Sequence, residues 1–324
     1  MSRRRSKPWL HRWSRPIVGA IALLGALNTG YITATKLMGE AAACPTSGCE
    51  TVLNSPYAFV LGQPLALFGF LAYVAMAIFA LGPLWVNPDA QKDLRLKLEN
   101  STWLLLFLGS TAMMLFSFYL MYIMVTEFVV PYGPQAVCFF CIASAILATA
   151  MFGVTLLGRT WDDVGQLLFS GLIVAVITVI GTLGVYANVG QAVDDGYNIV
   201  SGEGRVFFSI TETSGNAEIE LARHLEAVDA KMYGAFWCPH CYEQKKLFGV
   251  EALADFPYIE CAPEGQSPQV EVCQAAASQL EAAGGQFGYP AWEINGKIIT
   301  GRRSLEELAD LSDYQGPRDF KNTL

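Results

Sequence analysis

Five long apolar stretches constrain this chain more strongly than any other feature of its sequence. A helix needs about 20 mostly apolar residues to cross the hydrocarbon core of a bilayer, and each stretch is close to that length. Charged residues make up 15% of the 324 residues, whereas a soluble domain usually carries about 25%. The sequence therefore predicts a multi-pass α-helical membrane bundle within residues 16–189. The predicted spans are residues 16–37, 64–86, 101–126, 139–157 and 167–187.

Basic residues are distributed unevenly around these spans. Residues 1–15 contain Lys and Arg but no acidic residue, and the connectors 87–100 and 158–166 also contain Lys or Arg, whereas the other two connectors contain almost no basic residue. Lys and Arg collect on the cytoplasmic side of membrane proteins. The pattern predicts a cytoplasmic N-terminus and, after five crossings, a C-terminal region in the periplasm or lumen. Because residues 1–15 run directly into a span, they indicate a topology signal and not nucleic-acid binding.

The last part of the chain has the composition of a soluble domain. Residues 190–216 contain Gly, Ser and Asp and are predicted to be a linker, and residues 217–324 are predicted to form an α/β domain. Asn295-Gly296 is a strong signal for a hairpin turn. The predicted elements are a helix at 217–228, a strand at 231–236, a helix beginning near Cys238, a strand at 257–261, and then a helix at 270–283, a hairpin at 291–300 and a helix at 304–311.

All eight cysteines fall on the predicted non-cytoplasmic side. An even number of cysteines in an oxidising compartment predicts pairing. They are Cys44 and Cys49 in the first outer connector, Cys138 and Cys141 at the start of the fourth span, and Cys238, Cys241, Cys261 and Cys273 in the C-terminal domain.

Cys238 and Cys241 form a CxxC motif between a predicted strand and a predicted helix, a context that favours redox chemistry. The backbone N–H groups at a helix N-terminus stabilise the thiolate of the first cysteine. His240 would add positive charge and make the pair more oxidising, and Cys241 would be the resolving thiol. A zinc site completed by Cys261 and Cys273 and an inert disulfide are the alternatives.

The segment Trp237-Cys238-Pro239-His240-Cys241 resembles the active site of the thioredoxin family. The resemblance implies that Tyr289-Pro290, just before the hairpin, is the family's cis-proline, and that Pro290 and His240 contact the substrate. Cys261 and Cys273 lie outside the family motif. They are predicted to form a structural disulfide, with a second redox pair as the alternative.

Cys138 and Cys141 form a second CxxC motif, which begins a predicted membrane span. Residues three apart lie on one face of a helix, so both thiols can point into the bundle near the outer boundary. Packing alone is the alternative, since free cysteine is commonly buried. The sequence has no flavin or haem motif, and a lipid-soluble quinone is the predicted electron acceptor. The aromatic residues predicted to surround its flat ring are Phe68, Phe70, Phe139 and Phe140.

The first outer connector carries a further resemblance, together with the membrane CxxC motif and the domain order. The chain resembles the bacterial and plant homologues of vitamin K epoxide reductase that carry a fused thioredoxin-like domain. Their redox core is a four-helix bundle, which the resemblance implies for four of the five spans. The matching residues are Cys44, Cys49, Ser55, Pro56, Tyr57, Gly62, Pro64, Phe68, Gly69 and Tyr73.

The resemblance implies a relay of electrons. Cys44 and Cys49 would carry them from the thioredoxin-like domain to the membrane CxxC motif. The pairing first expected is Cys44 with Cys138 and Cys49 with Cys238, and the reverse pairing leaves the relay intact. Cys141 would lie nearest the quinone, and Ser55 would form a hydrogen bond beside the active site.

Two departures from vertebrate members bear on the reaction. Those members have a tyrosine four residues beyond the CxxC motif, where this chain has Ala145, and their asparagine at the quinone has no clear match. The prediction is therefore disulfide generation in reduced exported client proteins coupled to reduction of a ubiquinone, plastoquinone, phylloquinone or menaquinone, without a metal, in the lipid of a bacterial-type inner or thylakoid membrane. A transmembrane electron transporter that supplies reductant outward and a structural or zinc-binding membrane protein are the alternatives.

Overall fold

The computed structural model describes residues 9–38, 47–87, 91–161, 163–187 and 189–323. The chain forms two compact units, residues 1–53 with 57–187 and residues 54–56 with 188–324. Cys44 and most of the basic stretch at the start of the chain lie outside the described residues.

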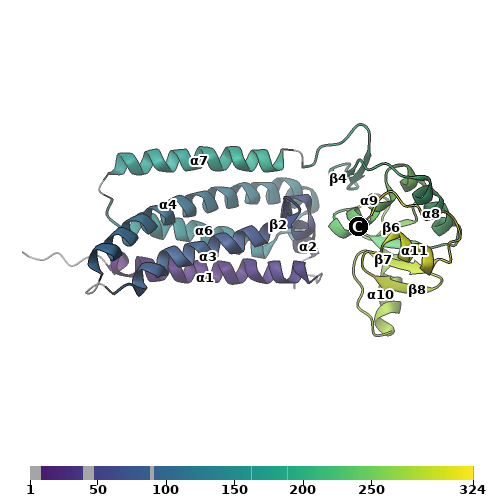
Figure 1. Cartoon of the computed structure of the whole chain (residues 1–324), viewed down its shortest axis with the longest axis horizontal. Helices are drawn as coiled ribbons and strands as arrows, with labels where there is room; N and C mark the ends of the chain where they lie inside the picture. Colours follow the sequence, from purple (N-terminus) through teal and green to yellow (C-terminus); the bar gives the residue numbers. More distant parts are fainter. Residues whose placement is uncertain (1–8, 39–46, 88–90, 162, 188, 324) are drawn as a thin grey trace, which may run out of the picture. The chain divides into compact units, whose positions relative to one another are not determined.

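Five helices in the first unit are long and apolar enough to cross a membrane, which confirms the predicted membrane bundle. Helices α1, α3, α4 and α6 pack against one another, and α7 lies along α4 (Figure 1). Most side chains of α7 are exposed and apolar, as expected of a helix that faces lipid. The bounds are Trp9–Leu37 for α1, Leu65–Leu81 for α3, Lys92–Ile123 for α4, Phe139–Leu157 for α6 and Val164–Tyr186 for α7.

Two predicted boundaries were wrong because polar residues extend the membrane helices. Helix α1 begins at Trp9, inside the predicted basic N-terminus, and α4 begins at Lys92, inside the predicted connector 87–100. An ion pair one helical turn apart, Arg95 Nε to Glu99 Oε1 at 2.9 Å, supports the polar start of α4. At its other end α4 continues into a π-helix, Met124–Val129, and a short helix α5, Val130–Tyr132.

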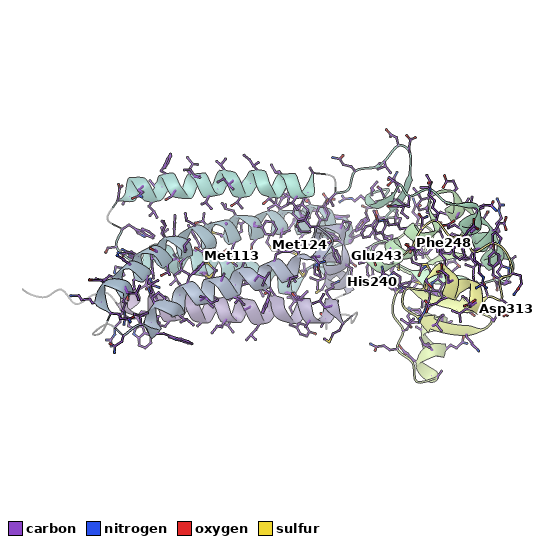
Figure 2. All side chains as sticks on the ribbon, viewed as in Figure 1. Met113, Met124, His240, Glu243, Phe248 and Asp313 are labelled. Carbon is purple, nitrogen blue, oxygen red and sulfur yellow. A yellow bond between two sulfur atoms is a disulfide. The ribbon has the colours of Figure 1, made fainter. Side chains whose placement is uncertain are left out.

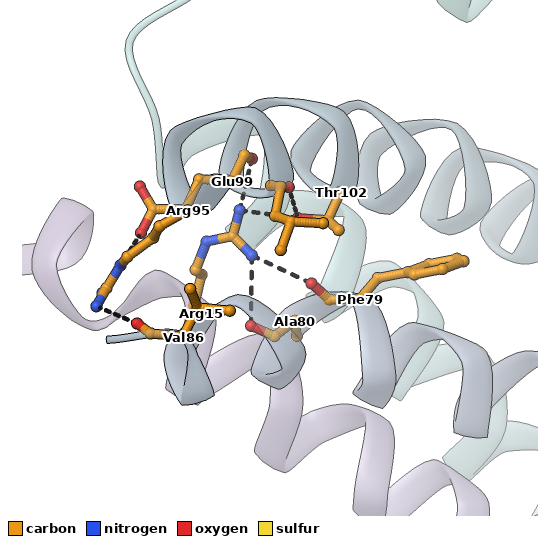
Figure 3. Close-up of polar contacts among 8 residues, drawn as sticks. Arg15, Phe79, Ala80, Val86, Arg95, Glu99 and Thr102 are labelled. Atoms are coloured by element: carbon orange, nitrogen blue, oxygen red, sulfur yellow. Dashed lines mark hydrogen bonds and ion pairs between the residues drawn. The ribbon is translucent and has the colours of Figure 1, made fainter. Parts of the chain in front are cut away.

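Arg15 ties three helices together near the start of α1 (Figure 3). Its guanidinium donates to the carbonyl oxygens of Phe79 (3.1 Å) and Ala80 (3.4 Å), near the C-terminus of α3. It also donates to Glu99 O (2.6 Å) and to the Thr102 hydroxyl (3.1 Å) on α4. A planar group with five N–H donors can satisfy several carbonyls at once, so one side chain fixes the packing of α1, α3 and α4 at this end.

The segment between α1 and α3 is short and regular where it is described. It contains helix α2 (Ser47–Asn54), a 3-10 turn (Pro56–Ala58) and the two-residue strands β1 (Phe59–Val60) and β2 (Gln63–Pro64). The hairpin turn at Leu61-Gly62 has positive φ at both residues, the geometry that glycine adopts without strain.

The second unit is built on a four-stranded sheet in the order β6-β5-β7-β8, with β5 and β6 parallel and the other pairs antiparallel. Helices pack around it, and Trp292 on β7 is fully buried. The predicted α/β domain is thereby confirmed. The strands are β5 (Lys231–Gly234), β6 (Tyr258–Glu260), β7 (Ala291–Ile294) and β8 (Lys297–Thr300), and the helices are α8 (Asn216–Ala227), α9 (Pro239–Phe248), α10 (Val270–Ala282) and α11 (Leu305–Leu311).

The predicted linker 190–216 was wrong in its central part. Strands β3 (Tyr197–Val200) and β4 (Val206–Ile210) form an antiparallel hairpin within it. The hairpin is held by packing: the rings of Phe207 and Phe236 meet edge to face at 4.7 Å, and those of Phe208 and Tyr242 stack at 4.8 Å. The aromatic residues on β4 therefore make this segment part of the second unit.

Candidate functional site

Cys138 and Cys141 are held together at the start of α6. Cys138 is the N-cap residue of the helix, and its sulfur accepts a hydrogen bond from the backbone N–H of Cys141 at 3.3 Å. The two residues form a disulfide with a Cα–Cα distance of 5.3 Å. Cys138 is fully buried, and its own N–H donates to the sulfur of Met124 at 3.4 Å. The predicted pairing of this CxxC motif on one face of the helix is present.

Beside this disulfide the first unit encloses an apolar cavity of about 460 Å³. Cys141 and Phe68 are among the residues that line it, whereas Phe70 is not. Phe139 is 51% exposed and is not a lining residue; its neighbour Phe140 is, because one residue along a helix changes the face by about 100°. Ser55 is buried just after α2 and is also not a lining residue.

The sequence analysis did not predict three polar residues of the cavity, Asn28, Tyr73 and Ser144, as site residues. The side-chain amide of Asn28 donates to the carbonyl of Phe140 at 3.1 Å. The hydroxyl of Tyr73 donates to the carbonyl of Ser144 at 2.9 Å and lies 3.2 Å from the Ser144 hydroxyl. The only usable signal was the position of Ser144, one helical turn beyond Cys141. Asn28 and Tyr73 lie far away in sequence, and only the fold brings them to α6.

Cys49 lies in α2 and is fully buried. It belongs to the same buried cluster as Cys138, Ile32, Leu53 and Met124, and it is disulfide-bonded. The structure thus places Cys49 in the same buried cluster as Cys138, the position that was expected of Cys44. Cys44 lies outside the described residues.

The CxxC motif of the second unit has the same local geometry. Cys238 is the N-cap residue of α9, and its sulfur accepts a hydrogen bond from the backbone N–H of Cys241 at 3.3 Å. Both cysteines are free thiols and both are buried. Gly234 on β5 permits the close approach of Cys241, because a Cβ at this glycine would lie 2.9 Å from the Cys241 sulfur.

A buried group of charged and polar side chains surrounds Cys241, and the sequence analysis missed it. Lys245, one turn further along α9, is 4% exposed, and its ammonium lies 3.2 Å from the centre of the Tyr258 ring. Glu260 accepts hydrogen bonds from the Tyr258 hydroxyl (2.9 Å) and from the backbone N–H of Ala262 (2.9 Å). From sequence alone, a lysine four residues after a CxxC motif is expected on the exposed face of the helix.

Burial dominates the electrostatics of this group. It lowers the pKa of Lys245 to about 8, although the neighbouring Cys241 and Glu260 oppose the shift. It raises the pKa of Glu260, and it raises the pKa of the Cys241 thiol, with the Cys238 sulfur adding to the effect and the charge of Lys245 opposing it. Burial thus disfavours the charged form of all three groups, and the charge of Lys245 partly offsets this effect at Cys241.

His240 points away from this buried group. Its ring nitrogen Nδ1 lies 3.1 Å from Glu243 Oε2 on the outer face of α9 (Figure 2), and Arg302 donates to the same carboxylate at 2.6 Å. The hydrogen bond from His240 lowers the pKa of Glu243. The Tyr289-Pro290 bond is cis, and the carbonyl of Tyr289 lies 3.8 Å from the Cys238 sulfur, so Pro290 is adjacent to the reactive thiol.

Cys261 and Cys273 form a disulfide between the end of β6 and α10, with a Cα–Cα distance of 5.7 Å. This bond engages both sulfurs that a zinc site at Cys238 and Cys241 would need. Among the residues that the structure describes, no group of three or more His, Cys, Asp or Glu is arranged to hold a metal ion.

Comparison with known proteins identifies a family and a relative. Residues 16–156 match the vitamin K epoxide reductase family. Over 296 residues the chain is 33% identical to the thiol-disulfide oxidoreductase LTO1 of Arabidopsis thaliana, an alignment that covers 89% of this chain and 73% of that protein.

Proposed function

Because this chain belongs to the vitamin K epoxide reductase family, with a fused thioredoxin-like domain, and is a thiol–disulfide oxidoreductase, we propose that it generates disulfide bonds in exported proteins and passes the electrons to a quinone. Thiol–disulfide exchange by itself needs only the two CxxC motifs. The order of transfer and the final acceptor are the substance of the proposal.

One observation carries the proposal: the two cysteines of the membrane motif face different surroundings. Cys141 lines the apolar cavity and packs against the edge of the cluster that contains Cys49, whereas Cys138 is fully buried inside that cluster and does not line the cavity. An electron relay needs such a division, because one sulfur must exchange with the incoming dithiol while the other meets the acceptor. A purely structural disulfide needs neither contact.

The steps follow from thiol–disulfide exchange, in which a thiolate attacks one sulfur of a disulfide and releases the other. A client dithiol reduces the Cys238–Cys241 disulfide, and the resulting dithiol reduces the loop pair. Cys49 then attacks Cys138 and releases the Cys141 thiolate, and Cys44 resolves the mixed disulfide. Fusion of the domains raises the effective concentration of the first dithiol at the loop.

The cavity supports a quinone as the last acceptor. A volume of about 460 Å³ lies in the range of small-molecule sites, and its wall is almost entirely apolar. When bound, the quinone takes up two electrons and two protons from the reduced membrane pair, which returns to the disulfide. Benzoquinones and naphthoquinones both suit such a cavity, since both are flat and apolar.

Orientation in the membrane is proposed from charge. The basic residues of 1–15, 87–100 and 158–166 place these segments in the cytoplasm, which puts the second unit in the periplasm or lumen. Client proteins that cross the membrane in reduced form are the substrates that such an arrangement can reach.

Purified full-length protein in detergent tests the proposal. Supplied with a reduced client protein and a short-chain benzoquinone, it should consume quinone and client thiols in the ratio of one to two. Client oxidation that proceeds at the same rate without quinone, in the absence of oxygen, would contradict it.

A further inference from the structure

The hydroxyl side chains of α6 do not all make the same contact. Thr149 and Thr155 each donate a hydrogen bond of 2.7 Å to the backbone carbonyl four residues earlier, a common arrangement within helices. Ser144 instead meets the hydroxyl of Tyr73 on α3, at 3.2 Å. Ser144 also follows Cys141 by three residues, so both side chains lie on one face of α6, and both line the cavity.

Asn28 explains the difference. The carbonyl four residues before Ser144 belongs to Phe140, and it accepts the side-chain amide of Asn28 on α1 at 3.1 Å. This bond engages the carbonyl to which a serine hydroxyl would otherwise donate. The Ser144 hydroxyl is thereby directed toward its neighbours in the cavity.

Tyr73 completes the arrangement. Its ring is 1% exposed and packs against Gly25 of α1, where any Cβ would collide with the ring. Its hydroxyl donates to the carbonyl of Ser144 at 2.9 Å, so its single hydrogen is committed while its oxygen remains an acceptor. The hydrogen of the Ser144 hydroxyl can therefore rest on Tyr73 and rotate to a ligand that enters the cavity.

We propose that Ser144 donates a hydrogen bond to a carbonyl oxygen of the quinone beside Cys141, and that Tyr73 and Asn28 position its hydroxyl. The inference rests on the proposed function. The reaction balances without a further reagent: the Cys138 and Cys141 dithiol loses two electrons and two protons, an S–S bond forms, and the quinone becomes the quinol.

The electrostatics of the cavity favour such a donor. Negative charge grows on the carbonyl oxygens of a quinone as it accepts electrons. A donor fixed in an apolar, water-poor site stabilises that charge more effectively than water does, and it needs no reorientation at the moment of transfer.

Three other hydroxyl groups of the cavity are less suited to this role. The hydroxyl of Thr29 donates to the carbonyl of Gly25 at 2.8 Å, one turn back along α1. Ser117 and Thr178 belong to α4 and α7, so neither shares a helix face with Cys141. Ser144 combines an available hydrogen with a place one turn from the reacting sulfur.

Ser144→Ala tests the inference in full-length protein in detergent, with dithiothreitol as electron donor and a short-chain benzoquinone as acceptor. Loss of one neutral hydrogen bond should lower kcat/KM for the quinone by about threefold to tenfold. Tyr73→Phe and Asn28→Leu should change it in the same direction by less, because they leave the serine hydroxyl in place. Thr149→Ala is the matched control, since its hydroxyl is bonded to its own helix, and it should leave kcat/KM unchanged.

A second readout separates a specific role from a structural one. Reduction of the Cys138–Cys141 disulfide by dithiothreitol without quinone, followed by thiol alkylation, should proceed at the wild-type rate in Ser144→Ala. Equal slowing of both steps would overturn the inference, and so would unchanged quinone kinetics in a wild-type protein that turns quinone over. Wild-type protein that consumes no quinone would instead refute the proposed function, and the inference with it.

Discussion

The two CxxC motifs of this chain have the same backbone arrangement and different surroundings. In each, the first cysteine is the N-cap of a helix, and its sulfur accepts the N–H of the second cysteine at 3.3 Å. In the membrane unit the second cysteine, Cys141, lines an apolar cavity. In the thioredoxin-like unit the second cysteine, Cys241, lies beside the buried side chains of Lys245 and Glu260.

In both motifs the helix N-terminus supplies the reactive thiol. The surroundings of the second cysteine then select the redox partner of the motif. An apolar cavity excludes water and admits a lipid-soluble acceptor. The charge of a buried lysine instead favours the thiolate of the resolving cysteine, the form that attacks a mixed disulfide in exchange with a protein. Substitutions in one unit or the other should therefore have different effects.

The largest effect is expected from Cys141→Ala. Without this sulfur the membrane pair cannot be reoxidised, and quinone consumption should fall by about a thousandfold or more. Cys138 remains able to form a mixed disulfide with the loop, because it lies in the cluster with Cys49. Stopped-time assays of quinone absorbance measure the loss, and wild-type quinone turnover in this variant would remove Cys141 from its assigned role.

Cys238→Ser should separate the two units. Oxidation of client proteins should fall to background, because the serine hydroxyl cannot replace the thiolate nucleophile. Quinone reduction by dithiothreitol should persist in part, because a small dithiol can reach the loop and membrane pairs directly. Parallel assays with both donors provide the test, and loss of both activities together would show that the units do not work as separable modules.

Lys245→Met should produce a smaller effect that depends on pH. Burial lowers the pKa of Lys245 to about 8, so the side chain is positive below that pH and neutral above it. The charge favours the Cys241 thiolate, and its removal should slow resolution at Cys241 by about tenfold for each unit by which the thiol pKa rises. The deficit should be largest below pH 8 and should shrink above it, where the wild-type lysine is also neutral.

Single-turnover transfer of electrons from the reduced Cys238–Cys241 pair to the loop pair, between pH 6 and 9.5, measures this profile. Lys246→Met is the matched control, because Lys246 is the adjacent residue but is exposed and ion-paired with Glu212 at 3.1 Å. A constant deficit across the whole pH range in Lys245→Met would indicate a packing role instead of an electrostatic one.

The smallest effect on redox turnover is expected from replacing Cys261 and Cys273 together with serine. Their disulfide closes a loop of 12 residues, and its loss should lower the local stability of this region by about 2–3 kcal/mol. Hydrogen exchange of peptides from β6 and α10 in the full-length protein measures the change. Quinone-coupled client oxidation should stay within about twofold of wild type, and its abolition would favour a second redox pair.

The fold was predictable where composition or a short motif determines it. The spans of α3, α6 and α7 follow from the length of their apolar stretches. The helix that begins at the Cys238–Cys241 motif follows from the strand and turn signals around it. The predictions failed at 190–216 and 87–100. Within 87–100 the Arg95–Glu99 pair, four residues apart, is a local helix signal that the prediction did not use. Within 190–216 local sequence carries no signal for the packing, because the partners of Phe207 and Phe208 lie about 30 residues further along.

The residues of the candidate site were likewise predictable only in part. The cysteines were found from spacing alone, and Phe68 from its resemblance to the family. Asn28, Tyr73 and the neighbours of Cys241 were missed because they converge only in three dimensions. Phe139 was misplaced because an aromatic residue in a CxxC motif gives no indication of which way it faces, and one position along the helix separates the cavity from the outer surface.

A trapping experiment tests the relay most directly. With Cys44 and Cys141 both replaced by alanine, neither resolving cysteine remains, and Cys49 and Cys138 are left as single thiols that only an oxidant can join. Non-reducing electrophoresis and peptide mapping after mild oxidation with diamide should then reveal a Cys49–Cys138 disulfide as the main intramolecular species. The reciprocal variant, with Cys49 and Cys141 replaced, should yield little Cys44–Cys138 disulfide. Accumulation of Cys44–Cys138 instead, or client oxidation coupled to quinone when both loop cysteines are alanine, would contradict the relay through Cys49.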